Sequence, residues 1–193
     1  MTGSLNYTAV GATRPGEQVW VDESPGYRRY ERTVRIGQGP ARWEAVRGEV
    51  LHWRVKTRSG FTVAVLTGDP PTGDLPTGEP LGDEPLIGDS TRVRLGGEYV
   101  LTAALGLFAL REPVRVVAVV DESDRCGFAY GTLEGHPVSG EEAFIVHRTP
   151  DAVIWLTLRS LTRPARGRWR LAFPAILVAQ HWYRWRYRRA LLS

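Results

Sequence analysis

Cysteine and lysine are almost missing from this sequence, and their scarcity excludes several classes of protein. Among 193 residues there is one cysteine, Cys126, and one lysine, Lys56. A single cysteine permits no intramolecular disulfide and no cysteine-based zinc site, which is typical of a reducing compartment, so we expect a cytoplasmic protein. We attribute the preference for arginine over lysine to genome composition rather than to mechanism.

Long apolar runs are also missing. A membrane-spanning helix needs about 18 or more apolar residues, and the best candidate, 171–179, has about half that length. Residues 1–13 lack the basic start and apolar run of a signal peptide. The sequence therefore predicts a protein without a membrane span.

Motifs of the common cofactor-dependent and hydrolytic enzymes are missing too. The histidines His52, His147 and His181 show no metal-ligand spacing, so we expect no metal site. The glycines around Gln38 lack the remainder of a phosphate-binding loop, and no Gly-x-Ser-x-Gly elbow occurs. These gaps predict a protein that uses no cofactor.

Acidic residues are missing from the last part of the chain. After Leu161 there are eight arginines and no acid, whereas the rest of the chain carries 17 basic and 21 acidic residues. Because the positive charge belongs to one segment, the sequence argues against a nucleic-acid-binding domain. It leaves open peripheral contact with an anionic membrane or an acidic partner.

The chain has the patterns of one α+β domain over residues 1–193. We expect a curved antiparallel sheet that grips a long C-terminal helix, with a ligand cavity of roughly 300–1,000 Å³ between them. A Pro/Gly-rich segment at about 69–89 is typical of a loop insertion. The predicted helices are 40–53 and 174–192. The predicted strands are 27–36, a pair within 55–66 that turns at Ser59-Gly60, 92–95, 98–104, 113–121, 127–134, 141–148 and 153–161.

One segment carries a family resemblance. Residues 127–144, GFAYGTLEGHPVSGEEAF, resemble the signature of uncharacterised protein family 0548, a domain of unknown function in bacteria and plants. The Asn6-Tyr7-Thr8 segment, Trp43, Trp53 and the terminal helix agree with that family. The order of elements is similar to the helix-grip fold of START-like proteins and polyketide cyclases, and this second resemblance implies ligand binding only by analogy.

The strand at 127–134 offers the first candidate site residues. Phe128, Tyr130, Thr132 and Glu134 share one face, and Gly131 is typical of a bulge or of a close approach by another group. Tyr130 and Thr132 can bond a ligand if this face meets the cavity. We favour a solvent-facing position for it, because antiparallel strands are commonly half-solvated. The predicted cavity wall consists of Trp43, Trp53, Tyr130, Thr132, Phe144, Trp155 and Tyr183.

Three residues are candidates for catalysis: Tyr130, His136 and Glu142. His136 lies at a hairpin tip, where it can transfer protons or simply cap the turn. Glu141 and Glu142 point to opposite faces of the next strand, so one of them faces inward and must be paired or protonated. A salt bridge to Arg159 or Arg148 and an acid/base pair with His136 are the two interpretations.

The sequence thus predicts a protein that binds an apolar or aromatic small molecule, with acid/base cyclisation as a further possibility. The alternative is a non-catalytic module that docks on anionic membranes or acidic partners through the arginine-rich terminal helix. On a helix, however, the aromatic residues of segment 181–189 also suit packing against the sheet. The sequence gives no oligomeric state.

Overall fold

A single sheet of seven antiparallel strands organises the chain, in the order β1-β7-β6-β5-β4-β3-β2. The computed structural model describes residues 3–21, 24–67, 92–105, 108–165, 167 and 169–192, so the predicted loop at 69–89 lies outside the described residues. The strands are β1 (Arg28–Gln38), β2 (Phe61–Thr67), β3 (Glu98–Leu105), β4 (Phe108–Asp121), β5 (Arg125–Thr132), β6 (Val138–Arg148) and β7 (Val153–Pro164).

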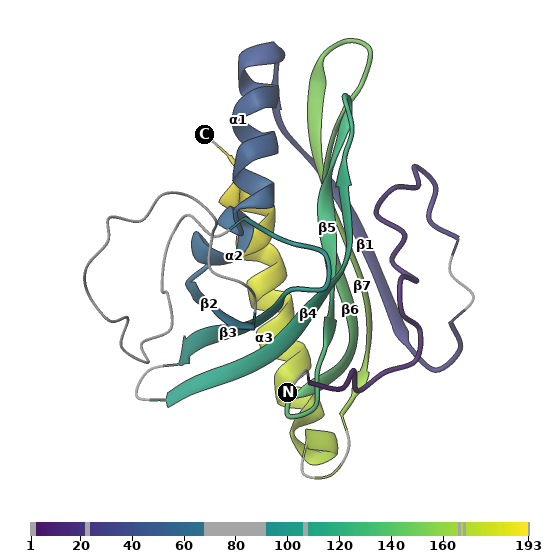
Figure 1. The fold of residues 1–193 in the computed structure, drawn as a ribbon, viewed down its shortest axis with the longest axis vertical. Helices are drawn as coiled ribbons and strands as arrows, with labels where there is room; N and C mark the ends of the chain where they lie inside the picture. The colour runs from purple at the N-terminus through teal and green to yellow at the C-terminus, as the bar shows by residue number, and fades with distance from the viewer. Residues whose placement is uncertain are drawn as a thin grey trace.

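Three helices lie on one side of this sheet: α1 (Pro40–Leu51), α2 (Arg54–Thr57) and α3 (Trp169–Ala190). Strands β1 and β2 form the two edges, and α1 and α2 connect one edge to the other. Figure 1 shows α3 passing α2, which it contacts, and continuing to the end of the molecule away from α1. The predicted α+β arrangement, with a long C-terminal helix against an antiparallel sheet, is confirmed.

The helix α1 begins where the sequence predicts it, with Pro40 in the first turn, where a missing N–H is tolerated. It ends early because Trp53 adopts a left-handed conformation with φ of 60°. Trp43, Val46 and Val50 of the predicted stripe are buried, as is Trp53. They pack on β5 and β6 and complete the main core.

Two predicted strands were wrong. Residues Arg54–Thr57 form the short helix α2 instead of the first strand of a hairpin, because four residues are too few to show a helical period. Residues 92–95 form no strand; Val93 donates one backbone hydrogen bond to Leu51, and the chain turns at Gly96.

The largest differences in element boundaries from the prediction are at the starts of β4 and α3. Strand β4 begins at Phe108 instead of Pro113, since the proline fits into the ladder opposite Val100. Helix α3 begins at Trp169, so Pro174 lies inside it rather than at its start. None of the helices within the described residues is long and apolar enough to span a bilayer.

The outer face of the sheet is covered by the chain before β1, residues 3–21 and 24–27, which we call the N-terminal segment. In Figure 1 this segment lies on the opposite side of the sheet from the helices. Strand β5 is therefore buried along its whole length. The expectation that Phe128, Tyr130 and Thr132 face solvent was wrong, because these side chains point toward the helices, and the N-terminal segment covers the other face.

Candidate functional site

The cavity lies between α3 and the inner face of the sheet, and residues of α2, β2, β4, β5, β6 and β7 complete its wall. Its volume is about 80 Å³. Ordinary ligand pockets measure roughly 300–1,000 Å³, so the predicted size was wrong. Aromatic packing fills the space: the Trp53 ring lies 4.6 Å from that of Phe128, and Phe144 lies 5.3 Å from Tyr187.

Lys56, the chain's one lysine, is the charged centre of this wall. The left-handed Trp53 ends α1 and lets the single turn of α2 direct Val55 and Lys56 inward, so Lys56 is only 2% exposed. Its Nζ donates to Glu142 Oε2 at 2.9 Å and to Tyr187 Oη at 2.7 Å. A buried ammonium is costly unless paired, and this pairing offsets the cost.

Aromatic rings surround the same ammonium. Nζ lies 4.5 Å from the ring centre of Tyr187, 4.6 Å from Phe61, 5.0 Å from Tyr130 and 5.5 Å from Phe144. The electron-rich faces of such rings attract a desolvated cation. The arrangement therefore fixes the position of Lys56 from several sides.

Glu142 accepts a second hydrogen bond on the same oxygen, Oε2, from the hydroxyl of Tyr130. Burial by itself raises the pKa of Glu142, but the Lys56 ammonium and the two hydrogen bonds outweigh it, and the pKa falls below its ordinary value. Burial, reinforced by the Glu142 charge, holds the pKa of Tyr130 well above its usual range. Glu142 is thus a carboxylate, and Tyr130 keeps its proton.

His136 and Glu112 form a second polar group in the cavity. The Nδ1 of His136 lies 3.0 Å from the backbone nitrogen of Val138 and 3.1 Å from its carbonyl oxygen, so the backbone of Val138 fixes the ring. Burial, followed by the charge of Lys56, lowers the pKa of His136 to about 3, so the ring is neutral. Burial raises the pKa of Glu112 to about 7 against the opposing effect of Lys56.

The two groups lie close without a direct hydrogen bond, since His136 Nε2 and Glu112 Oε2 are 3.8 Å apart. The ring caps its own turn, as one of the two sequence interpretations predicts, and it also lines the cavity. Its carboxyl neighbour is Glu112 and not Glu142. The proposed acid/base pair of His136 with Glu142 is therefore not the pair that the structure brings together.

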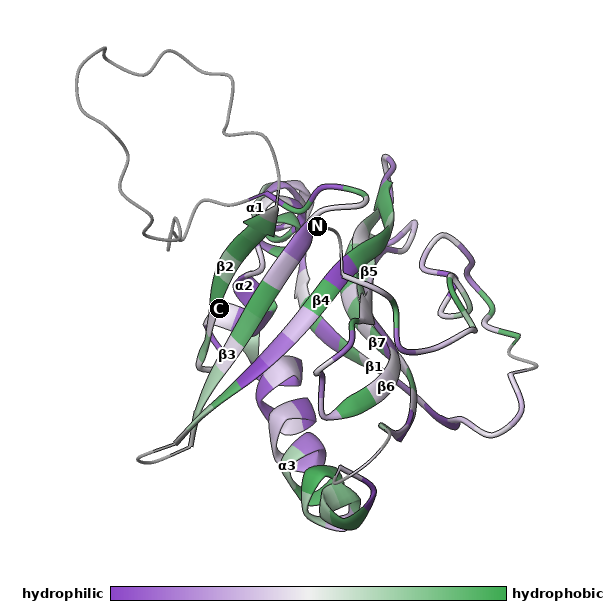
Figure 2. Cartoon of the chain, turned by 60° about the horizontal axis from the view of Figure 1, so that its bottom comes forward, coloured by the Kyte–Doolittle hydropathy of each residue, from purple (hydrophilic) through white to green (hydrophobic). Residues whose placement is uncertain are grey.

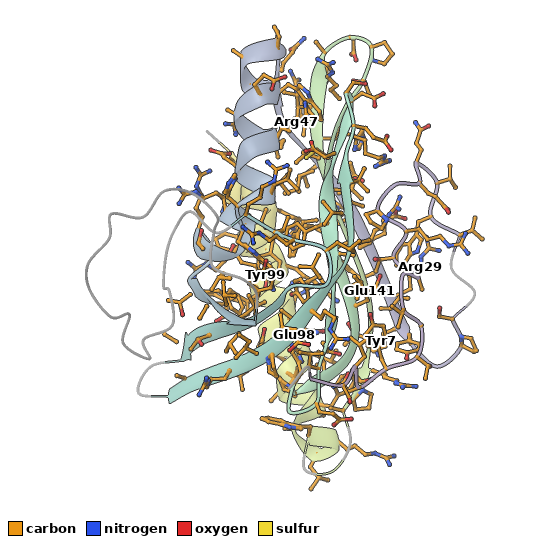
Figure 3. The ribbon with its side chains drawn as sticks, viewed as in Figure 1. Tyr7, Arg29, Arg47, Glu98, Tyr99 and Glu141 are labelled. Carbon is orange, nitrogen blue, oxygen red and sulfur yellow. The ribbon has the colours of Figure 1, made fainter. Side chains whose placement is uncertain are left out.

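Glu141 points to the other face of β6 and fixes the N-terminal segment. It accepts hydrogen bonds from Tyr7 Oη at 2.8 Å and from the backbone N–H groups of Gly11 at 2.7 Å and Thr13 at 3.0 Å. Figure 3 shows Tyr7 and Glu141 together on that side of the sheet. The predicted salt bridges of Glu141 or Glu142 to Arg159 or Arg148 were wrong, since Arg159 pairs with Glu31 at 2.9 Å.

The structure separates the predicted site residues into three groups. Five of them line the cavity: Tyr130, Thr132, His136, Glu142 and Tyr183. Trp43, Trp53 and Phe144 lie in the packed core beside it. Trp155 is on the outer face, because its neighbours Ile154 and Leu156 take the inward positions along β7.

Sequence reasoning missed Lys56, Glu112 and Gln180. The available signal for Lys56 was that it is the one lysine in the sequence, which genome composition also explains. Gln180 Oε1 is buried and has no hydrogen-bond partner among the described residues, although Gln180 lines the cavity. Such an acceptor is costly to bury and favours a donor supplied from outside the chain.

Outside the cavity, the reactive groups to consider among the described residues are metal ligands and the cysteine. In the described ranges, no three His, Cys, Asp or Glu side chains lie close enough to hold a metal ion. Burial raises the pKa of Cys126 to about 12, with Asp121 adding to the effect, so its thiol stays protonated. The cavity therefore contains the main cluster of chemical groups on the inner face.

A family description covers nearly the whole chain. The family described as "Domain of unknown function (DUF1990)" matches residues 6–79 and 83–190. The chain belongs to this family. The resemblance to uncharacterised protein family 0548 is also confirmed, because curated relatives carry that family name.

Two relatives illustrate the family. A UPF0548 protein of Deinococcus radiodurans is 44% identical over 75 residues, which is 39% of this chain and 37% of that protein. A UPF0548 protein of Arabidopsis thaliana is 28% identical over 105 residues, which is 51% of each chain. The chain thus spans about a third to a half of the length of these curated relatives.

Solved structures resemble the chain more distantly. Ginseng major latex-like protein 151 from Panax ginseng aligns with a TM-score of 0.47 and 12% identity, over 86% of this chain and 99% of that one. A hypothetical protein from Helicobacter pylori aligns with a TM-score of 0.48 and 8% identity, over 88% of each chain. Likeness at this level says nothing about what this chain binds.

Proposed function

We propose that this chain binds a small organic molecule in the cavity between α3 and the sheet. The head of the ligand carries a neutral oxygen and lies at Lys56, and its apolar part lies against Leu110, Ile176 and Tyr183. The observation that carries the proposal is the buried Lys56–Glu142–Tyr130 cluster beside the unpartnered Gln180 Oε1. Charged and polar groups gathered in an enclosed cavity are typical of a binding site.

A neutral oxygen fits the charges already present. An ammonium has three donors, and Lys56 directs two of them to Glu142 and Tyr187, so one remains for a ligand oxygen. A hydroxyl accepts that hydrogen bond and has a proton to donate, and Gln180 Oε1 offers an acceptor on the same wall. A ligand carboxylate would be repelled by Glu142, and a ligand amine by Lys56.

Cavity size sets a limit on the ligand. About 80 Å³ accommodates only a few heavy atoms unless the wall moves. The first half of α3 is the loosely packed part of that wall, because no side chain from Trp169 to Trp182 is fully buried. An apolar or aromatic ligand of the kind predicted from the sequence enters if this half of α3 shifts outward.

Matched probes of one size test the head-group preference. Isobutanol, isobutylamine and isobutyrate are titrated into labelled protein, and amide chemical shifts are followed by NMR. We expect saturable shifts at Thr132, Gln180 and Tyr183 with the alcohol only. In Gln180→Leu the loss of one hydrogen bond weakens this binding by about threefold to tenfold, whereas the exposed control Gln18→Leu leaves it unchanged.

The proposal fails if the amine or the carboxylate binds as well as the alcohol. It also fails if the alcohol shifts do not saturate, or if they saturate equally in Gln180→Leu. A folded spectrum of each variant shows that the comparison is between intact proteins.

A second candidate function is acid/base catalysis, of which cyclisation is one example. The observation that favours it is Glu112, whose pKa of about 7 suits proton transfer at neutral pH. The Nε2 of His136 lies 3.8 Å from Glu112, and Tyr130 and Glu142 lie in the same cavity. In this proposal Glu112 replaces His136 as the group that exchanges protons.

A further inference from the structure

The outer face of α3 carries an apolar stripe along its whole length. Leu171 is 89% exposed, Val178 72%, Trp182 48% and Trp185 45%. Steps of three and four residues place these side chains on one side of the helix, a different side from the buried Tyr183 and Tyr187, although the ring of Trp182 touches that of Tyr183 at its edge. The stripe consists of Leu171, Ala175, Val178, Trp182 and Trp185, and Leu192 extends it past the helix end.

An exposed apolar stripe of this length is unusual on a soluble surface and indicates contact with another body. Figure 2 shows hydrophobic colour on the first turns of α3, which project beyond the strands. The buried face of α3 already holds the helix to the sheet through Tyr183, Tyr187 and Ala190. The stripe is therefore not needed for the fold described above.

Positive charge flanks the stripe. Helix α3 contains five arginines and no acidic residue. The guanidinium of Arg186 lies 4.8 Å from the ring centre of Trp182, and that of Arg189 lies 4.6 Å from Trp185. Two arginines thus lie at the level of the two exposed indoles.

A groove of about 540 Å³ beside Trp185 extends this charge. Four arginines line it, and its one carboxylate, Glu49, already pairs with Arg58 at 2.6 Å. The lining arginines are Arg42, Arg58, Arg186 and Arg189. The groove therefore has an excess of cations next to the apolar stripe.

We propose that the outer face of α3 docks this protein on an anionic lipid surface. The indoles of Trp182 and Trp185 enter the interface, where an amphipathic ring has both apolar and polar neighbours. The arginines beside them and in the groove contact the lipid phosphates, and their stems cover apolar surface. A second copy of the chain fits less well, because two such faces bring arginines together without a carboxylate from either α3.

Vesicle binding tests this docking surface. The full chain is mixed with vesicles of phosphatidylcholine and phosphatidylglycerol in equal parts, or of phosphatidylcholine alone, and sedimented. We expect binding to the anionic vesicles, a blue shift of tryptophan emission, and weakening as salt rises. The double variant Trp182→Ser/Trp185→Ser lowers the partition coefficient by about tenfold or more.

Matched controls lie elsewhere on the surface. Leu95→Ser removes another exposed apolar side chain and leaves binding unchanged. Arg189→Glu weakens binding, whereas Arg111→Glu, also at an exposed position, does not. Both tryptophans are exposed, so the double variant keeps the fold, which circular dichroism verifies.

Three outcomes overturn the proposal. Equal binding by the double variant and the wild type would show that the stripe does not contact the vesicle. Equal binding to neutral and anionic vesicles, or binding to neither, would show that the protein does not recognise anionic lipid. A dimer in light scattering that the double variant abolishes shows that a second copy covers the face instead.

Discussion

At the scale of single residues, the buried Lys56 determines the state of its neighbours. Its ammonium keeps Glu142 ionised against the effect of burial, and it adds to the larger effect of burial in lowering the pKa of His136. Burial raises the pKa of Glu112, and no lysine or arginine of the described residues forms an ion pair with it. One cavity thus contains two carboxyl groups whose pKa values are displaced in opposite directions.

Glu112 gives the chain a distinctive pH dependence. Its pKa is raised from 4.5 to about 7 in the folded chain, so between these values the folded chain holds a proton that the unfolded chain has lost. The free energy of unfolding therefore falls as pH rises through this window, by on the order of 2–3 kcal/mol from this group. Glu142 acts the other way: because its pKa is lowered in the folded chain, the stability that it contributes is lost as the pH falls.

Urea unfolding at about pH 5 and about pH 8 measures the difference. In Glu112→Gln we expect the free energy of unfolding to fall less between these two pH values, by on the order of 2–3 kcal/mol. Glu134→Gln, at an exposed position, keeps the wild-type difference. An unchanged pH difference in Glu112→Gln would mean that Glu112 titrates normally.

Sequence reasoning identified Tyr130, Thr132, His136 and Glu142, which the structure places in the cavity wall. These residues lie on one hairpin, β5 and β6, where alternation along a strand assigns faces. Lys56 and Glu112 come from α2 and β4, which pairing across long stretches of sequence brings to the same place. No local pattern contains that information.

At the scale of elements, the N-terminal segment acts as a second layer on the sheet. Gly131 shows how closely it approaches, since a Cβ at this position would lie 2.1 Å from the hydroxyl of Tyr7. The sequence prediction that Gly131 marks a close approach is confirmed. The covering layer itself was not predicted, because residues 3–27 have no helical or strand period. The face that carries Tyr130 was misjudged separately, because alternation shows which residues share a face but not which face points inward.

Removing the carboxylate of Glu141 should release this layer. In Glu141→Ala the amides of Gly11 and Thr13 lose their acceptor, and we expect their hydrogen exchange to approach that of an open segment. The change costs on the order of 2–4 kcal/mol of stability. Glu134→Ala is the matched control, and wild-type protection of Gly11 and Thr13 in Glu141→Ala would show that other contacts hold the segment.

At the scale of the whole molecule, a meander of strands and one terminal helix enclose the site. The topology was predictable, because alternation, turns and the length of the last helix are local features. The cavity volume was not predictable, since it depends on how the rings of Trp53, Phe128 and Phe144 interdigitate. The remaining space is small and lies next to charged groups rather than within an apolar chamber.

Native mass spectrometry of protein purified from its own host tests ligand binding in this cavity most directly. We expect the wild type, and Val178→Trp at the exposed neighbouring position, to carry a small-molecule adduct that is released on denaturation. Ala179→Trp fills the cavity and loses that adduct while it remains folded. A wild type without an adduct, or an adduct retained in Ala179→Trp, would contradict the account.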